Sequence, residues 1–223
     1  MKLTIPKICS YIGGIFLVAL GVNLSKMAGL GISPVASLPH AVELIWGIEL
    51  GLATAIVYLF LIAFQLLLLR KFSIFPFFQL LTTLIMSGFT TMTSSAYLLK
   101  WLERPGNYLQ AFALLAISIV LIGIGVFFYI RPGYIPIPSE GTAKTLVQVS
   151  HGKLQFPNAK VAVDCSMVAI SAILTLAALG GVAGIREGTV ITALLVGKMV
   201  GVCRKIEKSV ISRKRRITEV GEL

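Results

Sequence analysis

Few ionisable residues lie within or beside the apolar stretches of this chain, and these few are the best candidates for chemistry. They are Glu140, Lys160, Asp164 and the adjacent residues Arg186 and Glu187. Charged side chains at membrane depth are costly and often functional. A carboxylate in a low-dielectric cavity binds a proton more readily than in water, so Glu140 and Asp164 are candidate proton carriers. One interpretation places them around a single cavity with Arg186 and Glu187.

The alternative interpretation is local ion pairing. Glu140 and Lys144 are four residues apart, as are Lys160 and Asp164, so each pair can meet on one face of a helix. Long charged side chains near the membrane surface can also extend toward water. Glu187 can stabilise the N-terminus of a helix that follows it.

No catalytic or metal-binding motif accompanies these residues. The two histidines, His40 and His151, are far apart in the sequence and belong to no metal-ligand spacing. The sequence has no P-loop, no G-x-S-x-G nucleophile motif and no zinc-protease motif. We therefore expect no catalytic residue, no metal, no cofactor and no enzymatic activity.

Two segments rich in glycine and proline would position the charged residues. They are Ala28–Val42 (AGLGISPVASLPHAV) and Arg131–Leu146 (RPGYIPIPSEGTAKTL). Proline lacks a backbone donor and restricts the preceding residue, so a helix cannot continue unchanged through either segment. Ser33 and Ser139 are suitable caps for new short helices. Irregular backbone survives in hydrocarbon only when it is buried or faces a cavity, so the segments are either re-entrant half-helices or interfacial loops.

The composition indicates a membrane protein. The chain has 223 residues, of which 57% are hydrophobic and 13% charged, and its mean hydropathy is +0.91. A soluble domain has about 25% charged residues. A spanning helix needs about 20 mainly apolar residues, and six such runs occur, at about 8–24, 50–69, 75–99, 108–130, 161–179 and 185–202. They leave no room for a separate soluble domain, so we expect one all-α membrane domain over residues 1–223.

Positive charge is concentrated on one predicted side of the membrane. The net charge is +11, and much of it lies in the tail 204–223, which contains RKIEKSVISRKRR. With six spans, both termini share a side with Lys2, Lys71 and this tail, and the positive-inside rule makes that side cytoplasmic. The same rule explains the basic tail more simply than nucleic-acid binding does. We therefore expect a multi-pass protein of the bacterial inner membrane, in contact with the lipid bilayer, with no nucleic-acid partner.

Aromatic residues would mark the two membrane interfaces, as aromatic belts do in other membrane proteins. The expected outer set is Trp46, Tyr97, Trp101 and Tyr108, and the expected inner set is Tyr11, Tyr129 and Tyr134.

The sequence also repeats weakly. A shift of 104 residues aligns Gly29 with Gly133 and Pro34 with Pro138. The order of features repeats as well: a span, a Gly/Pro break, a short amphipathic piece and two further spans. The two halves cover about 8–100 and about 108–203, and each has three spans. Because three is an odd number, the second half must insert into the membrane with the opposite orientation to the first. The predicted fold is therefore six transmembrane helices as two inverted three-helix repeats, with broken half-helix or re-entrant segments.

The third predicted span carries a hydroxyl-rich face. Hydroxyl side chains recur there at three and four residues, at Thr83, Ser87, Thr90, Thr91, Ser94 and Ser95. Gln65 and Gln79 add amides nearby. Such groups commonly bond to their own helix or to a neighbouring one, so we expect a packing role, with a solute path as the alternative.

Four motifs resemble a known family. AGLGISP (28–34) and GIREGTVITALLVG (184–197) resemble paired signatures of the YczE/YyaS/YitT-type bacterial membrane proteins. PSEGTAKTL (138–146) and KVAVD (160–164) are similar to second-half motifs in one branch of that family. The resemblance covers nearly the whole chain and implies a polytopic inner-membrane protein without a defined activity. One departure is the end of the third span, GFTTMTS, where the family pattern implies an acidic residue after the aromatic one.

The motif residues and the two predicted caps form the candidate substrate- or ion-binding set. Its members are Gly29, Gly31, Ser33, Pro34, Pro138, Ser139, Glu140, Gly141, Lys160, Asp164, Arg186, Glu187, Gly188 and Thr189.

Two hypotheses of different class follow. The first is a transporter or exporter of an unknown small solute, which we expect to form a homo-oligomer because six spans enclose little volume. The second is a non-transporting accessory or assembly factor that acts on a partner protein or a lipid pathway. Solute flux in vesicles favours the first, whereas a stable partner without flux favours the second.

Overall fold

The computed structural model describes residues 5–70, 74–95, 97–151 and 153–221, with side chains up to Ser209 apart from 74, 75 and 208. Lys2, Lys71 and most side chains of the basic tail lie outside the described residues. Within the described part the chain is all-α, with eight α-helices, one short 3-10 helix and no strand. The predicted fold class is confirmed at that level.

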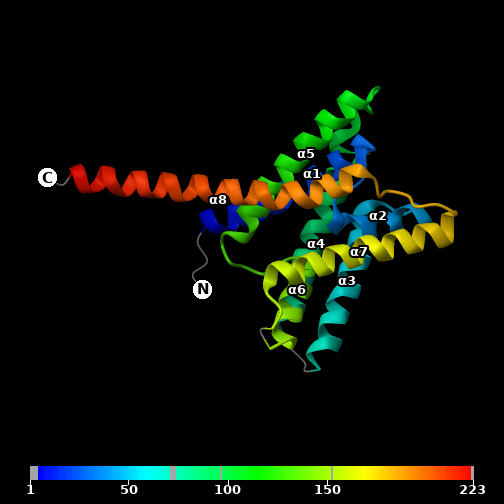
Figure 1. Cartoon of the computed structure of the whole chain (residues 1–223), viewed down its shortest axis with the longest axis horizontal. Helices are drawn as coiled ribbons and strands as arrows, with labels where there is room; N and C mark the ends of the chain where they lie inside the picture. Colours follow the sequence, from blue (N-terminus) through cyan, green and yellow to red (C-terminus); the bar gives the residue numbers. More distant parts are fainter. Residues whose placement is uncertain (1–4, 71–73, 96, 152, 222–223) are drawn as a thin grey trace.

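The helices follow the predicted apolar runs and breaks (Figure 1). They are α1 (Ile5–Ala28), α2 (Pro34–Trp46), α3 (Leu50–Leu69), α4 (Ile74–Met92), the 3-10 helix η1 (Leu98–Trp101), α5 (Tyr108–Ile130), α6 (Pro138–Val149), α7 (Phe156–Leu179) and α8 (Glu187–Gly221). Four of them, α1, α3, α5 and α7, are long and apolar enough to cross a membrane, as in a multi-pass membrane protein. The other two predicted runs form α4 and α8, which are not among these four.

The third predicted span ends earlier than expected. The run was predicted to extend to residue 99, but α4 ends at Met92. The Thr93 hydroxyl donates to the Phe89 carbonyl (2.7 Å), and the Ser94 amide bonds to the Thr91 carbonyl (3.1 Å). The Ser94 amide thus bonds three residues back rather than four, so the α-helical pattern stops before Ser94.

The Gly/Pro segments form the two short helices that the sequence predicts. Pro34 and Pro138 are the first residues of α2 and α6, where the missing N–H costs nothing. Gly29 and Gly133 both have φ of 69°, a left-handed conformation that lets the chain turn after the preceding helix. Each short helix thus begins at a proline that follows a glycine turn.

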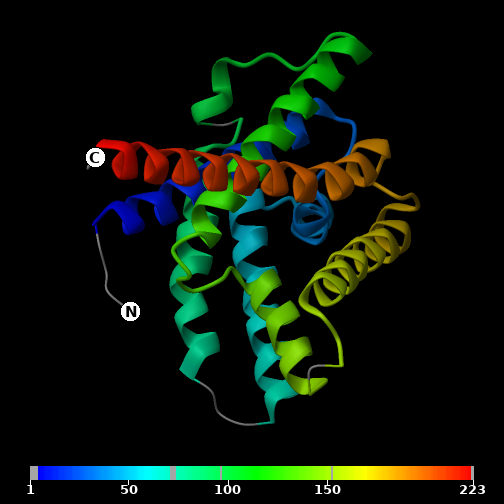
Figure 2. The same cartoon turned by 60° about the vertical axis from the view of Figure 1, so that its left-hand side comes forward.

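The helices of the two halves pack across one another (Figures 1 and 2). α1 and α5 form the most extensive pair, and the short helix α2 packs on α7 while α6 packs on α3. The first residues of α1 and the end of α8 lie on the same side of the molecule in both views. Each short helix therefore packs on a long helix of the other half as well as on one of its own half.

Glycines allow the close contact between α1 and α5. A Cβ at Gly14 would lie 2.7 Å from the Gly125 carbonyl oxygen, and a Cβ at Gly125 would lie 2.7 Å from the Gly14 carbonyl oxygen. Small residues at such crossings let helix backbones approach in a membrane. The pair cannot be this close with any larger residue at either position.

The hydroxyls of α4 bond within the helix bundle. Thr83 donates to the Gln79 carbonyl (2.9 Å), Thr90 to the Met86 carbonyl (2.8 Å), and Ser87 across to the Gly51 carbonyl of α3 (2.7 Å). These bonds support the expected packing role, because the hydroxyls are already paired with backbone.

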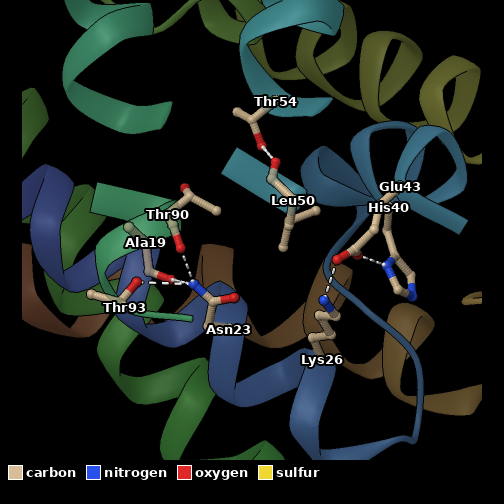
Figure 3. Close-up of polar contacts among 9 residues, drawn as sticks. All are labelled: Ala19, Asn23, Lys26, His40, Glu43, Leu50, Thr54, Thr90 and Thr93. Atoms are coloured by element: carbon tan, nitrogen blue, oxygen red, sulfur yellow. Dashed lines mark hydrogen bonds and ion pairs between the residues drawn. The ribbon is translucent and has the colours of Figure 1, made fainter. Parts of the chain in front are cut away.

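A buried amide joins α1 to the same face of α4. Asn23, 2% exposed, donates to the Thr90 carbonyl (2.8 Å) and the Thr93 hydroxyl (2.9 Å), as Figure 3 shows. The hydroxyl face of α4 is therefore turned toward protein rather than toward lipid.

Candidate functional site

The start of α6 is held between α3 and α4 by a buried pair of amides. The side chains of Gln65 and Gln79 exchange two hydrogen bonds, at 2.9 and 3.1 Å, and both are fully buried. Gln65 also donates to the Pro138 carbonyl (3.3 Å). A Cβ at Gly141 would collide with the Gln79 amide, so glycine is required for this close approach. The first turn of α6 is therefore fixed in position by helices of the first half.

The predicted cap at Ser139 is wrong. α6 begins at Pro138, one residue earlier, because proline has the backbone torsion of a first helical residue and lacks the N–H that would need a cap. Ser139 is consequently the second residue of the helix, and it is fully buried. Ser33 does occupy the predicted N-cap position of α2, but its side chain makes no capping hydrogen bond.

Glu140 lies in the first turn of α6 and is only 7% exposed. Three tyrosines from other helices, Tyr11 of α1, Tyr58 of α3 and Tyr129 of α5, lie within electrostatic range of its carboxylate. The rings of Tyr11 and Tyr129 pack edge to face with their centres 6.3 Å apart. Helices from both halves of the chain therefore enclose a single carboxylate.

The hydroxyls around Glu140 are incompletely bonded. Tyr11 donates to the Ile135 carbonyl (2.6 Å). By contrast, the buried hydroxyls of Tyr129, Tyr134 and Ser139 make no hydrogen bond of full geometry among the described residues. Tyr129 nevertheless lies beside the Glu140 carboxylate, and Ser139 lies beside the Tyr58 hydroxyl. Leaving a buried polar group unpaired costs about 1–3 kcal/mol, and such groups usually indicate a water, an ion or a ligand.

The site therefore keeps unused hydrogen-bonding capacity. A hydroxyl can both donate and accept a hydrogen bond, whereas an ionised carboxylate only accepts. A hydrogen-bond donor or a cation would therefore bind the Glu140 carboxylate and the hydroxyls at the same time.

A second charged pair lies on α7, near Glu140. Lys160 donates to Asp164 at 2.8 Å, which confirms the predicted pair, and both side chains are about one quarter exposed. Both charges act on Glu140 through space. The predicted pair between Glu140 and Lys144 does not form, because Glu140 turns into the bundle while Lys144 is exposed.

The remaining predicted residues gather at a different place. The Arg186 guanidinium donates to the Gly29 carbonyl (3.0 Å) and to Glu187 (3.2 Å), and the Gly188 amide donates to the Leu30 carbonyl (2.7 Å). A Cβ at Gly31, where φ is 107°, would lie 2.6 Å from the Thr189 hydroxyl.

These contacts join the turn before α2 to the start of α8. Pro34 and Ser33 follow on from that turn, so they belong to the same group. The structure thus brings the predicted residues together in two groups, one at Glu140 and one at Arg186, rather than around one cavity.

Sequence reasoning missed a third cluster, which lies between the last turn of α1 and the second half of α2. Glu43 bonds to both Lys26 and His40, the latter at 2.6 Å (Figure 3). Burial alone would raise the pKa of Glu43, but the hydrogen bonds from His40 and Lys26 and the positive charge of Lys26 outweigh it, so the pKa lies below its usual value. The available signal was the spacing of His40 and Glu43, three residues apart on one helix.

Two of the tyrosines around Glu140 do not lie where the sequence predicts. Tyr11 and Tyr129 were expected at the inner membrane interface, yet they are 8% and 2% exposed and belong to the interior of the bundle. The expected outer set, by contrast, is exposed throughout: Trp46, Tyr97, Trp101 and Tyr108.

Comparison with known proteins adds the family. A model of a family of unknown function, DUF6198, matches residues 5–205. No curated protein and no solved structure shows a significant match to the chain. Because the match covers most of its length, the chain belongs to the family of unknown function DUF6198.

Proposed function

We propose that this protein is a transporter or exporter of a small solute in the bacterial inner membrane, and that Glu140 and the surrounding hydroxyls bind the solute or its coupling ion. The observation that carries the proposal is the burial of Glu140 at the start of an interrupted helix, beside buried hydroxyls that make no hydrogen bond of full geometry in the described structure. A carboxylate at such depth is expensive, and in membrane proteins it commonly marks a substrate or ion pathway.

The arrangement of the halves supports an inverted repeat of three helices each. α2 and α6 occupy equivalent places, each begins with a proline, and each packs on a long helix of the other half. In transporters of this kind, the binding site lies at the repeat interface and is formed by interrupted helices. The Glu140 site fits that description, because α1 and α3 of the first half meet α5 and α6 of the second half there.

The topology completes the proposal. The first residues of α1 and the end of α8 lie on one side of the molecule, and the distribution of basic residues favours a cytoplasmic location for that side. The resemblance to the YczE/YyaS/YitT-type proteins agrees with a polytopic inner-membrane protein. A homo-oligomer is the proposed assembly, since a single chain encloses little volume.

The test is flux through the purified protein in vesicles that contain a pH-sensitive dye. A panel of small solutes is added outside, and solute-dependent proton movement is recorded at several pH values. We expect Glu140→Gln to abolish this movement or remove its pH dependence, and Glu140→Asp to retain part of it, because the shorter acid keeps the charge. Glu103→Gln is the matched control, since Glu103 is an exposed acid in the connection before α5 and does not belong to the candidate set.

Wild-type flux in a folded Glu140→Gln protein would exclude this role for Glu140. A wild-type protein that moves no solute and co-purifies with a stable partner would instead favour an accessory or assembly factor.

A further inference from the structure

A large cavity lies between α2, α3, α6 and α7, and Glu140 is not among the residues that line it. Its volume is about 1260 Å³, and it is partly open to the outside. α3 contributes Phe60, Phe64 and Leu67 to its wall, and α7 contributes Met167 and Ile170. The cavity therefore separates two of the helices that are long and apolar enough to span a membrane.

The cavity wall offers almost nothing to a polar guest. None of the described residues that line it is charged, and only Thr142 and Ser166 carry hydroxyls. Both hydroxyls are already bonded to backbone, Thr142 to the Pro138 carbonyl (2.8 Å) and Ser166 to the Ala162 carbonyl (2.7 Å). An apolar cavity of this kind stays dry and takes apolar molecules.

The surroundings and the size of the cavity point to lipid. Because α3 and α7 are candidate spans, the open side faces hydrocarbon, where acyl chains are the most abundant apolar groups. Phe60 and Leu67 at its wall are 72% and 75% exposed. Pockets for compact small ligands have volumes of about 300–1,000 Å³, so this cavity has room for a longer, flexible chain.

Basic residues lie close in the sequence to residues of the cavity wall. Arg70 follows α3 three residues after Leu67, and Lys160 precedes Ala162 of the cavity wall by two residues on α7. Lys153 is exposed in the connection that leads into α7. Basic groups between membrane helices bind lipid phosphates. We infer that the cavity binds a membrane phospholipid, with an acyl chain in the cavity and the phosphate toward Arg70.

This inference does not depend on transport, so its test uses binding alone. The full chain is purified in detergent, and native mass spectrometry records bound lipid while phosphatidylglycerol is added. Ala63→Phe and Ala162→Phe fill the cavity from opposite walls, and Ala169→Phe adds the same ring on an exposed part of α7 that does not line it. We expect lipid to remain bound to the wild type and Ala169→Phe, and to bind about tenfold or more weakly to the filled variants.

Folding is checked by circular dichroism and gel filtration, and two filling variants are used so that one misfolded protein does not decide the result. Absence of a phospholipid adduct on the wild type would overturn the inference, whatever the variants do. So would folded filling variants that bind lipid as the wild type does, or a retained molecule whose mass matches no phospholipid.

A separate comparison tests the position of the phosphate. Arg70→Gln should weaken phosphatidylglycerol binding, whereas Arg104→Gln, a change in the connection before α5 at a residue that does not line the cavity, should not. Equal affinities for the two variants would refute the placement of the phosphate at Arg70.

Discussion

Replacing Gln65 by leucine tests whether a buried amide pair holds the start of α6 in place. Gln65 makes three hydrogen bonds, two with Gln79 and one with the Pro138 carbonyl. The Pro138 carbonyl keeps a second donor, the Thr142 hydroxyl at 2.8 Å. The main loss is therefore the Gln79 amide, which stays fully buried without its partner.

The expected loss of stability follows from that unpaired amide. A buried polar group left without a partner costs about 1–3 kcal/mol, and Gln79 cannot easily turn away because Gly141 packs against its amide. Gln65→Leu should therefore lower the free energy of unfolding by about 1–3 kcal/mol. The double variant Gln65→Leu/Gln79→Leu should recover most of this, because removal of both partners leaves no unpaired group.

The assay is unfolding in mixed micelles with increasing SDS, followed by circular dichroism, on the two single variants, the double variant and the wild type. The coupling energy of the cycle should exceed about 0.5 kcal/mol, the usual limit for independent sites. Gln148→Leu is the control, because Gln148 is exposed near the other end of α6. Additive effects of the two single changes would refute the proposed coupling, and a Gln65→Leu protein as stable as the Gln148→Leu control would refute the role of the pair.

Two further predictions concern the turn before α2 and the cluster at its end. Gly31→Ala should lower the free energy of unfolding by more than about 1 kcal/mol, because it combines a left-handed backbone with a Cβ 2.6 Å from the Thr189 hydroxyl. Gly47→Ala is the control, because Gly47 is also left-handed but its Cβ would lie in open space, so its loss of stability should be smaller. Equal decreases in melting temperature for the two variants would contradict the clash at Gly31. The lowered pKa of Glu43 contributes stability that is present above its usual pKa and is lost as the pH falls through the lower, folded-state value. The melting temperature, measured between about pH 3 and pH 7, should therefore fall more steeply at the acid end for the wild type than for Lys26→Gln. If the melting temperatures of the two proteins change with pH in parallel, the Lys26 charge does not lower the pKa of Glu43.

The local elements of the fold could be predicted because they depend on short stretches of sequence. Pro34 and Pro138 start helices since the ring fixes φ and removes a donor, wherever the helices later pack. The pair of Lys160 and Asp164 follows from a spacing of four on one helix. The cap at Ser139 failed for a local reason too, because Pro138 is an even better first residue.

The candidate site could be predicted only in part. Glu140 was identified from its charge beside an apolar run. Its neighbours Tyr11, Tyr58 and Tyr129 were not, because a tyrosine near the end of a span has the same sequence signal whether it faces lipid or protein. The sequence also could not predict that the Arg186 group lies apart from Glu140.

The sequence by itself determined most of the helices and the two Gly/Pro breaks, since each depends on the torsions and solvation of neighbouring residues. The burial of Glu140 came from the tertiary structure, because the sequence equally allowed an ion pair with Lys144. The tertiary structure alone decided which helices meet across the two halves: α2 packs on α7 and α6 packs on α3. These contacts join residues about 70 to 160 positions apart, such as Gln65 with Pro138 and Gly29 with Arg186. They depend on whether whole helix surfaces fit together, with glycines such as Gly141 at the closest approach, and no short pattern in the chain records that fit.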